Sequence, residues 1–496
     1  MIFNSIEFLL FFPIVVCVYG IVPRHYRYLW LLVSSYYFYM CWIPKYALLI
    51  ALSTLITYIS GILIERTARV QDLKKRIILK KACVAGSLVS NLFILFIFKY
   101  ANFVFDNISY ISSSFGLHYQ APKLDILLPV GISFYTFQAL SYTLDVYRGN
   151  IRAEKNLLRY SLFVSFFPQL VAGPIERSEN LLPQIQHIEA IRVWDYDRFR
   201  DGLVLMLWGF FQKLVIADRA AIVVNRVING YSEYGFMSLA VASVLFAFQI
   251  YCDFGGYTNI ARGSARVMGF ELMDNFRQPY LAGNIKEFWR RWHISLTSWF
   301  TDYLYIPLGG NRRGELRKYI NIIIVFGISG LWHGASWNYL AWGLVHAIYQ
   351  IVGDIKKRLF GQVMRMKNIA VKNNVFFKII NILFTFILVD VAWVFFVCNS
   401  FSHAIAVFRQ MLSNQAMCSL EELGLNTTNW IILAVALVVL MVVDVLRENG
   451  ISAYGILKKC VFPIRWIVYV GLAVVVVMLG IYGKQYDTST FIYFQF

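Results

Sequence analysis

Two histidines in tryptophan-rich stretches are the residues best suited to chemistry in this very apolar chain. His293 ends the run Phe-Trp-Arg-Arg-Trp-His, and His333 lies in the run Leu-Trp-His-Gly. An imidazole exchanges protons near neutral pH, so a histidine at membrane depth is a candidate acid or base. We predict that this pair marks the active site.

His333 has the neighbours expected of a general base. Glycines nearby permit close approach of the backbone, and the tryptophan rings exclude water. An imidazole placed in this way can accept the proton of a hydroxyl that attacks a thioester, while N–H groups of Trp332 or Asn338 stabilise the oxyanion. From spacing alone, a histidine that caps a helix or packs in a core is an equally good interpretation.

A basic and aromatic run precedes His293. Arg290 and Arg291 can hold the phosphates of a nucleotide-like donor through bidentate pairing, with Trp289 beside them. The alternative is a belt of aromatic and basic residues at the membrane interface, which the local pattern slightly favours. His346, in a later apolar stretch, is predicted to pack near the site and support it.

The composition predicts an all-α protein that crosses a membrane many times. Of the 496 residues, 59% are hydrophobic and 15% are charged, which excludes an ordinary soluble enzyme and a disordered chain. About a dozen apolar stretches approach the roughly 20 residues that a spanning helix needs. These stretches are 6–22, 28–42, 46–63, 82–98, 126–147, 203–217, 236–250, 319–331, 336–352, 376–397, 430–446 and 465–482.

The formal net charge of +18 comes from Lys and Arg in short loops, so it indicates orientation in the membrane and not binding to nucleic acid. The positive-inside rule assigns residues 65–81, 253–299 and 353–378 to the cytoplasm. Counting the membrane crossings that follow these loops leaves residues 484–496 outside. The seven cysteines form no Cys-x-x-Cys pair and no cluster with histidine. We therefore expect neither a metal site nor a disulfide framework.

The chain shows no internal repeat and no separate soluble domain, so residues 1–496 are predicted to form a single integral-membrane domain. Residues 162–172 and 299–310 are too short or too rich in Pro and Gly for spanning helices, and we expect them to be re-entrant or interfacial. Irregular backbone at membrane depth is tolerated only where it is buried in protein or lines a wet cavity. A cavity is therefore predicted.

The chain carries four composite motifs, at residues 128–148, 165–177, 288–310 and 331–343. Together they resemble the signature of the membrane-bound O-acyltransferase family, in its bacterial branch of alginate O-acetyltransferases. The likeness covers most of the chain and is strongest over residues 128–352. It implies a ring of about a dozen transmembrane helices around a central tunnel, with His333 as the catalytic residue and His293 as the second functional position.

The resemblance further implies acetyl-CoA as the donor substrate, with no other cofactor. It implies a multi-pass protein of the bacterial cytoplasmic (inner) membrane, embedded in lipid, whose extracytoplasmic partner is an SGNH-type acetyltransferase acting on a polysaccharide. The residues predicted to bind the donor are Trp289, Arg290, Arg291, Trp332 and Asn338.

The last six residues, Phe-Ile-Tyr-Phe-Gln-Phe, fit a Phe-x-Tyr-x-x-Phe pattern. This pattern is similar to the C-terminal motif of the small companion protein in teichoic-acid D-alanylation, where a tyrosine is proposed to carry the acyl group. The resemblance implies that Tyr493, within the tail 484–496, is an acyl carrier. The alternative is an aromatic anchor at the membrane interface.

Two other functions remain open from the sequence. One is an acyltransferase that takes its acyl group from a carrier protein, as in D-alanylation. The other is a transporter of a lipid-linked sugar, in which the histidines couple transport to protons. A transporter predicts paired repeats and several acids inside the spans, and the chain shows no repeat and only Glu7, Asp145, Asp390 and Asp444 near such depth.

Overall fold

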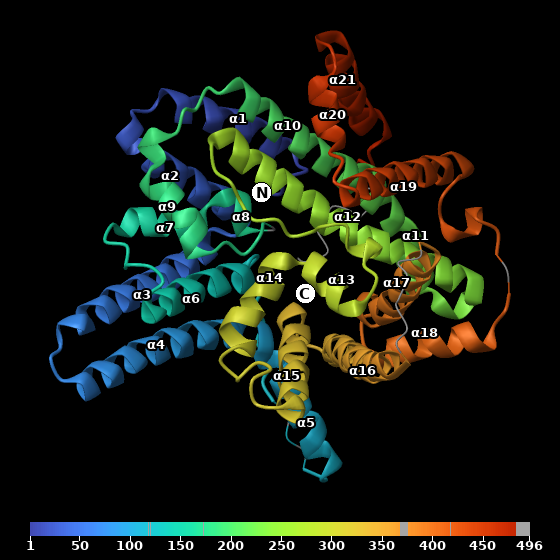
Figure 1. Cartoon of the computed structure of the whole chain (residues 1–496), viewed down its shortest axis with the longest axis horizontal. Helices are drawn as coiled ribbons and strands as arrows, with labels where there is room; N and C mark the ends of the chain where they lie inside the picture. Colours follow the sequence, from blue (N-terminus) through green and yellow to red (C-terminus); the bar gives the residue numbers. More distant parts are fainter. Residues whose placement is uncertain (118, 120, 172, 368–374, 417, 483–496) are drawn as a thin grey trace. The chain divides into compact units, whose positions relative to one another are not determined.

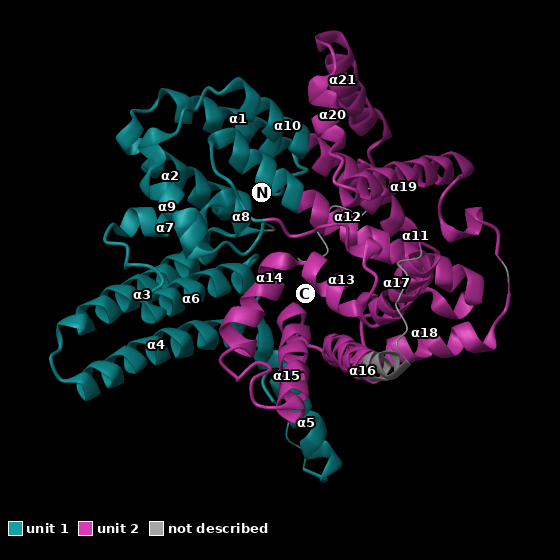
Figure 2. Ribbon diagram, viewed as in Figure 1, with its two compact units in different colours: residues 1–206, 258–273 teal, residues 207–257, 274–496 magenta. Residues whose placement is uncertain are grey.

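The computed structural model describes residues 1–482 except 118, 120, 172, 368–374 and 417, and every regular element in this part of the chain is a helix. The all-α prediction is thus confirmed (Figure 1). The chain divides into two compact units, residues 1–206 with 258–273 and residues 207–257 with 274–496 (Figure 2). Both candidate histidines belong to the second unit.

The first unit contains the helices of the N-terminal part: α1 (Ile6–Ile21), α2 (Arg27–Met40), α3 (Ala47–Arg66), α4 (Leu73–Leu95), α5 (Ala101–Ser114), α6 (Ile132–Arg148), α7 (Leu157–Ser165), α8 (Phe167–Leu170), α9 (Ser178–Gln186) and most of α10 (Tyr196–Phe210). Helices α3, α4 and α6 pack against one another (Figure 1). Ser53 of α3 donates a hydrogen bond to Asn91 of α4 (2.5 Å), and the hydroxyls of Ser87 and Thr143 join α4 to α6. Small polar side chains of this kind allow close packing of membrane helices.

The second unit contains the elements that position the histidines: the π-helix η6 (Phe211–Ala217), α11 (Asp218–Asn229), much of α12 (Phe236–Met268), α13 (Ile285–Arg291), α14 (Ile294–Phe300), the π-helix η9 (Thr301–Tyr305), α15 (Glu315–His333), α16 (Trp337–Lys367), α17 (Val375–Val397), α18 (Phe401–Ser413), α19 (Thr427–Glu448), α20 (Ala453–Lys459) and α21 (Phe462–Leu479).

Six helical segments of the described chain are long and apolar enough to cross a membrane, which indicates a multi-pass membrane protein. They are Pro44–Arg69, Leu73–Ser114, Phe236–Met268, Val375–Val397, Thr427–Glu448 and Phe462–Leu479. Each overlaps one of the dozen predicted spans. The other six predicted spans also form helices, but α1, α2 and α6 have fewer than 18 residues, and α10, α15 and α16 fall outside these six segments.

The two segments predicted to be irregular do interrupt their helices. Helix α7 ends at Phe166, whose φ of −53° and ψ of 111° leave the helical region before the single turn of α8. Helix α14 passes into the π-helix η9, and the chain then turns at Gly309 and Gly310, both with positive φ. Short helices and turns, rather than long spans, therefore surround the His293 segment.

Candidate functional site

The two candidate histidines meet inside the second unit. His293 is the N-cap of α14, and His333 is the last residue of α15. Their ring centroids lie 6.4 Å apart, and the two residues are only 1% and 3% exposed. Two residues that are 40 positions apart in the chain thus form one buried imidazole pair.

His293 adopts a backbone conformation that is rare for a residue with a side chain. Its φ of 43° and ψ of 55° lie in the left-handed region, which costs roughly 1–3 kcal/mol and persists only when neighbours enforce it. Asn275 supplies that enforcement, because its carbonyl accepts the N–H of Ile294 (2.9 Å) and its side-chain oxygen accepts the hydroxyl of Ser295 (2.6 Å). The strained backbone aims the His293 ring into the core.

Burial lowers the pKa of His293 to about 3, so the ring is neutral at physiological pH. A neutral imidazole has one N–H donor and one acceptor nitrogen, whereas a protonated ring can only donate. His293 can therefore take part in proton transfer or orient a polar group without placing a buried charge in the site.

Aromatic rings enclose both imidazoles. His333 packs edge-on against Trp332 and Trp342, each with a ring centroid 5.0 Å away, and Phe254 of α12 packs 4.7 Å from His293. These rings exclude water, which strengthens any electrostatic interaction within the site. The surroundings predicted for a general base are present.

Two glycines fix the position of the helix that ends at His333. A Cβ on Gly330 of α15 would lie 2.2 Å from the Tyr339 carbonyl oxygen, and a Cβ on Gly343 of α16 would lie 2.2 Å from the Phe326 carbonyl oxygen. Only residues without a side chain allow α15 and α16 to approach this closely. The close contact places His333 beside the aromatic rings of α16.

The indole of Trp342 is a site group that the sequence interpretation missed. The residue is fully buried, and its Nε1–H has no hydrogen-bond partner among the described residues. A buried donor without a partner costs free energy, so it calls for a functional explanation. The feature of the sequence that could have indicated a role for Trp342 is its place in the Trp-rich motif at residues 331–343.

The predicted donor-binding residues divide into three groups. Arg290 is exposed, whereas Arg291 forms ion pairs with Glu287 and Glu448, both at 2.5 Å. Trp332 is buried against the ring of His333, as described above. Only Arg290 thus offers its guanidinium to solvent.

Trp289 and Asn338 both make contacts inside the fold. The indole of Trp289 donates to Nδ1 of His346 (3.3 Å), which places the proton of the neutral His346 ring on Nε2. The amide of Asn338 donates to the carbonyls of Phe395 (3.2 Å) and Cys398 (2.8 Å). The prediction that His346 packs near the site is confirmed.

A buried ion triad near the site was also missed. Lys213 of η6 lies 2.8 Å from a carboxylate oxygen of Asp218 and 2.6 Å from one of Asp253, and all three side chains are at most 4% exposed. Asp253 directly precedes Phe254, which packs on His293. The available signal was a charged residue, Lys213, inside a predicted span, since such a residue is normally paired.

The motif at residues 165–177 places a buried carboxyl in the first unit. Glu176 is fully buried and accepts hydrogen bonds from the Met273 N–H (2.5 Å) and the Asn180 amide (2.7 Å). Burial raises its pKa to about 7. This carboxyl joins the motif to the segment after α12.

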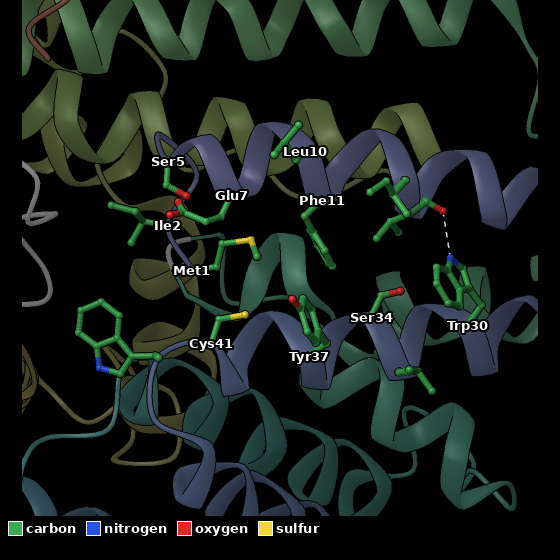
Figure 3. Close-up of a pocket in the computed structure, with 14 residues that line it drawn as sticks. Met1, Ile2, Ser5, Glu7, Leu10, Phe11, Trp30, Ser34, Tyr37 and Cys41 are labelled. Carbon is green, nitrogen blue, oxygen red and sulfur yellow. Dashed lines mark hydrogen bonds between the residues drawn. The ribbon is translucent and has the colours of Figure 1, made fainter. Parts of the chain in front are cut away.

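A groove of about 860 Å³ lies between α1 and α2 in the first unit (Figure 3). Ser5 and Glu7 line one end, and Trp30, whose indole donates to the Val15 carbonyl (3.0 Å), lies at the other. None of the predicted site residues lines this groove. Tyr493, the predicted acyl carrier, lies outside the described residues.

Comparisons with known proteins agree with the motifs. The model of the membrane-bound O-acyltransferase family matches residues 150–391. A probable alginate O-acetylase of Pseudomonas putida is 37% identical over 83% of this chain and 80% of its own length. A peptidoglycan O-acetyltransferase of Helicobacter pylori is 35% identical over 79% of this chain and 76% of its own length. A teichoic acid D-alanyltransferase of Bacillus subtilis is 27% identical over 46% of this chain and 59% of its own length.

Proposed function

Because this chain belongs to the membrane-bound O-acyltransferase family, and is therefore a multi-pass membrane O-acyltransferase, we propose that it moves an acetyl group from acetyl-CoA in the cytoplasm to an extracytoplasmic acceptor. The names of two extensively matching relatives, an alginate O-acetylase and a peptidoglycan O-acetyltransferase, support acetyl as the acyl group and a polysaccharide as the final acceptor. The proposal includes the ring of helices around a tunnel and a location in the bacterial inner membrane.

The observation that carries the proposal is the buried pair of imidazoles within aromatic walls. His333 acts as the general base: it accepts the proton of an attacking hydroxyl while the hydroxyl oxygen bonds to the thioester carbon. The tetrahedral intermediate then expels the thiolate of CoA, and the proton passes from His333 to that sulfur. His293, neutral and held in place by Asn275, orients the thioester on the donor side.

The indole of Trp342 supplies the oxyanion donor in this proposal. Its buried N–H has no partner among the described residues, and its ring lies 5.0 Å from that of His333. A donor that is already oriented and desolvated stabilises a developing oxyanion, and loss of one such donor typically slows a reaction about 10²–10³-fold. Arg290, exposed beside this segment, remains the candidate for the phosphates of CoA.

Tyr493 is proposed as the first acceptor hydroxyl. Its acetyl ester, with a phenolate leaving group, is activated relative to an alkyl ester, so the acetyl group can pass on to a sugar hydroxyl. An SGNH-type partner outside the membrane would catalyse this second transfer. The terminal Phe-x-Tyr-x-x-Phe pattern supports this step.

The test uses the purified protein in lipid vesicles with acetyl-CoA labelled in the acetyl group. We expect release of CoA and a labelled C-terminal peptide. His333→Gln should abolish both, and Tyr493→Phe should abolish the peptide label. His187→Gln, which changes an exposed histidine, is the matched control and should retain parental activity.

Each alternative gives a different result in this assay. Folded parent protein that neither releases CoA nor takes up label refutes acetyl-CoA as the donor. Label that appears on the protein only when a carrier protein loaded with labelled D-alanine replaces acetyl-CoA would indicate a D-alanylation-like donor. Tyr493→Phe protein with parental acetyl transfer to the acceptor would remove the tyrosine from the pathway.

A further inference from the structure

We propose that Arg219 anchors the C-terminal end of α21 and so fixes the point from which the tail carrying Tyr493 begins. The inference rests on the proposed function of that tyrosine. Arg219 lies on α11 directly after Asp218 of the buried ion triad, and it is itself 2% exposed. It is a positioning residue, because its contacts are with backbone and an amide and not with the reacting groups.

The guanidinium of Arg219 joins three elements through hydrogen bonds. It donates to the Leu479 carbonyl at the end of α21 (2.7 Å), to Oδ1 of Asn429 in the first turn of α19 (3.0 Å) and to the Val215 carbonyl of η6 (2.5 Å). Carbonyls in the last turn of a helix lack partners within the helix, and a cation there is favourable. One buried side chain thus ties the end of α21 to the start of α19.

A second contact reinforces this anchor directly beyond the helix. The N–H of Ile481 donates to the Leu214 carbonyl of η6 (3.0 Å), and the Tyr482 hydroxyl donates back to the Val476 carbonyl (2.7 Å). The last described residues are therefore held against the same π-helix that carries Lys213 of the ion triad. A π-helix is rare and often lies at a functional site.

The rest of α21 does little to fix its own position. Within Phe462–Leu479, all of which the structure describes, Val476 is the one buried residue, and the other apolar side chains are exposed or partly exposed. Exposed apolar side chains on a span-length helix suit lipid, which does not select one position for the helix. The contacts at Arg219 and Leu214 therefore determine where the tail starts.

A fixed start makes acetyl transfer to the tail an intramolecular step. Tyr493 follows Ile481 by twelve residues, so an extended chain reaches at most about 40 Å from the anchor. Release of the anchor would allow residues 479–482 to leave this position, so we expect Tyr493 to be acetylated more slowly.

The experiment compares Arg219→Gln with Arg226→Gln, a matched change two turns along the same helix whose exposed guanidinium contacts the Tyr234 hydroxyl. Each protein receives labelled acetyl-CoA, first alone and then with a synthetic peptide of residues 483–496 at millimolar concentration. We expect Arg219→Gln to label its own tail about two- to fourfold more slowly than the parent, while it labels the free peptide at the parental rate. Arg226→Gln should match the parent in both reactions.

Three results overturn the inference. Parental labelling of the tail by Arg219→Gln refutes the anchor, and an equal fall for the tail and the free peptide shows that the change damaged the catalytic site instead. If Arg219→Gln does not fold, Arg219→Lys replaces it, because lysine keeps the charge but lacks the planar fork that bonds Leu479, Asn429 and Val215 together. The third result is a parental tail-labelling rate in Arg219→Lys. Failure of the proposed function is distinct, because then the parent labels neither its tail nor the free peptide.

Discussion

Replacement of Lys213 by methionine should be the most destabilising single change in the second unit, because it leaves two carboxylates buried without their cation. Lys213 lies 2.8 Å from Asp218 and 2.6 Å from Asp253, and all three side chains are almost completely shielded from solvent. Methionine fills a similar volume, so the lost charge, and not a cavity, dominates the effect.

The magnitude follows from the two contacts. At an effective dielectric constant near 20, a unit pair at this separation is attracted by about 6 kcal/mol, and most of that gain offsets the cost of removing the ions from water. Removal of one partner from a buried pair typically costs about 3–5 kcal/mol. For a chain of this length, such a loss lowers the unfolding temperature by about 3–5 °C.

The assay is thermal unfolding of detergent-purified protein. It measures the fraction of protein that remains monodisperse after heating to each temperature. The control is the triple variant Lys213→Met/Asp218→Asn/Asp253→Asn, which removes all three charges and should recover most of the lost stability. A Lys213→Met protein as stable as the parent would refute the ion-triad reasoning. A triple variant no more stable than the single one would show that packing, and not charge, is responsible.

Three further changes test other parts of the structure. Gly343→Ala should force α15 and α16 apart and reduce acetyl transfer, measured as CoA release, at least 100-fold. Gly353→Ala is the control, because its Cβ would meet open space, and it should leave CoA release unchanged. Trp342→Phe should slow CoA release about 10²–10³-fold, with no larger loss of stability than Trp289→Phe. Trp289→Phe makes the same change in ring size and also breaks a hydrogen bond to His346, which should cost about 1 kcal/mol more in thermal unfolding. Burial raises the pKa of Glu176 from 4.5 to about 7, so between these pH values the folded state holds a proton that the unfolded state has lost. The free energy of unfolding should therefore fall by about 3 kcal/mol as the pH rises from 4.5 to 7. Glu176→Gln should flatten this pH profile, and an unchanged profile would contradict the assignment.

The helical architecture could be predicted because long apolar stretches allow few other structures in a membrane. The six candidate spans are strongly apolar, and each needs only its own backbone hydrogen bonds to form. The remaining predicted stretches, such as 126–147, form helices whose buried faces carry polar side chains. Hydropathy alone does not separate a helix that crosses lipid from one packed among other helices.

His293 and His333 could each be singled out from their motifs, but neither their contact nor the partners of other side chains could be predicted. Arg291 resembles a phosphate ligand in the sequence, yet it pairs with Glu448, which lies 157 residues later. Lys213 of η6 likewise forms an ion pair with Asp253 of α12, which lies 40 residues later in the chain. Local sequence contains no information about such distant partners, so only the fold shows which arginine forms ion pairs within the protein.

The position of His333 at the end of α15 has an electrostatic consequence for the proposed reaction. The aligned peptide dipoles of a 19-residue helix give its C-terminal end a partial negative charge, worth about 0.3–1 kcal/mol to a nearby cation. A base becomes positively charged when it takes a proton, and this ring does so at the helix pole that favours positive charge. In the proposed reaction the polarity of α15 would lower the energy of the imidazolium formed at His333, so the direction in which the chain runs through this helix would favour the transfer.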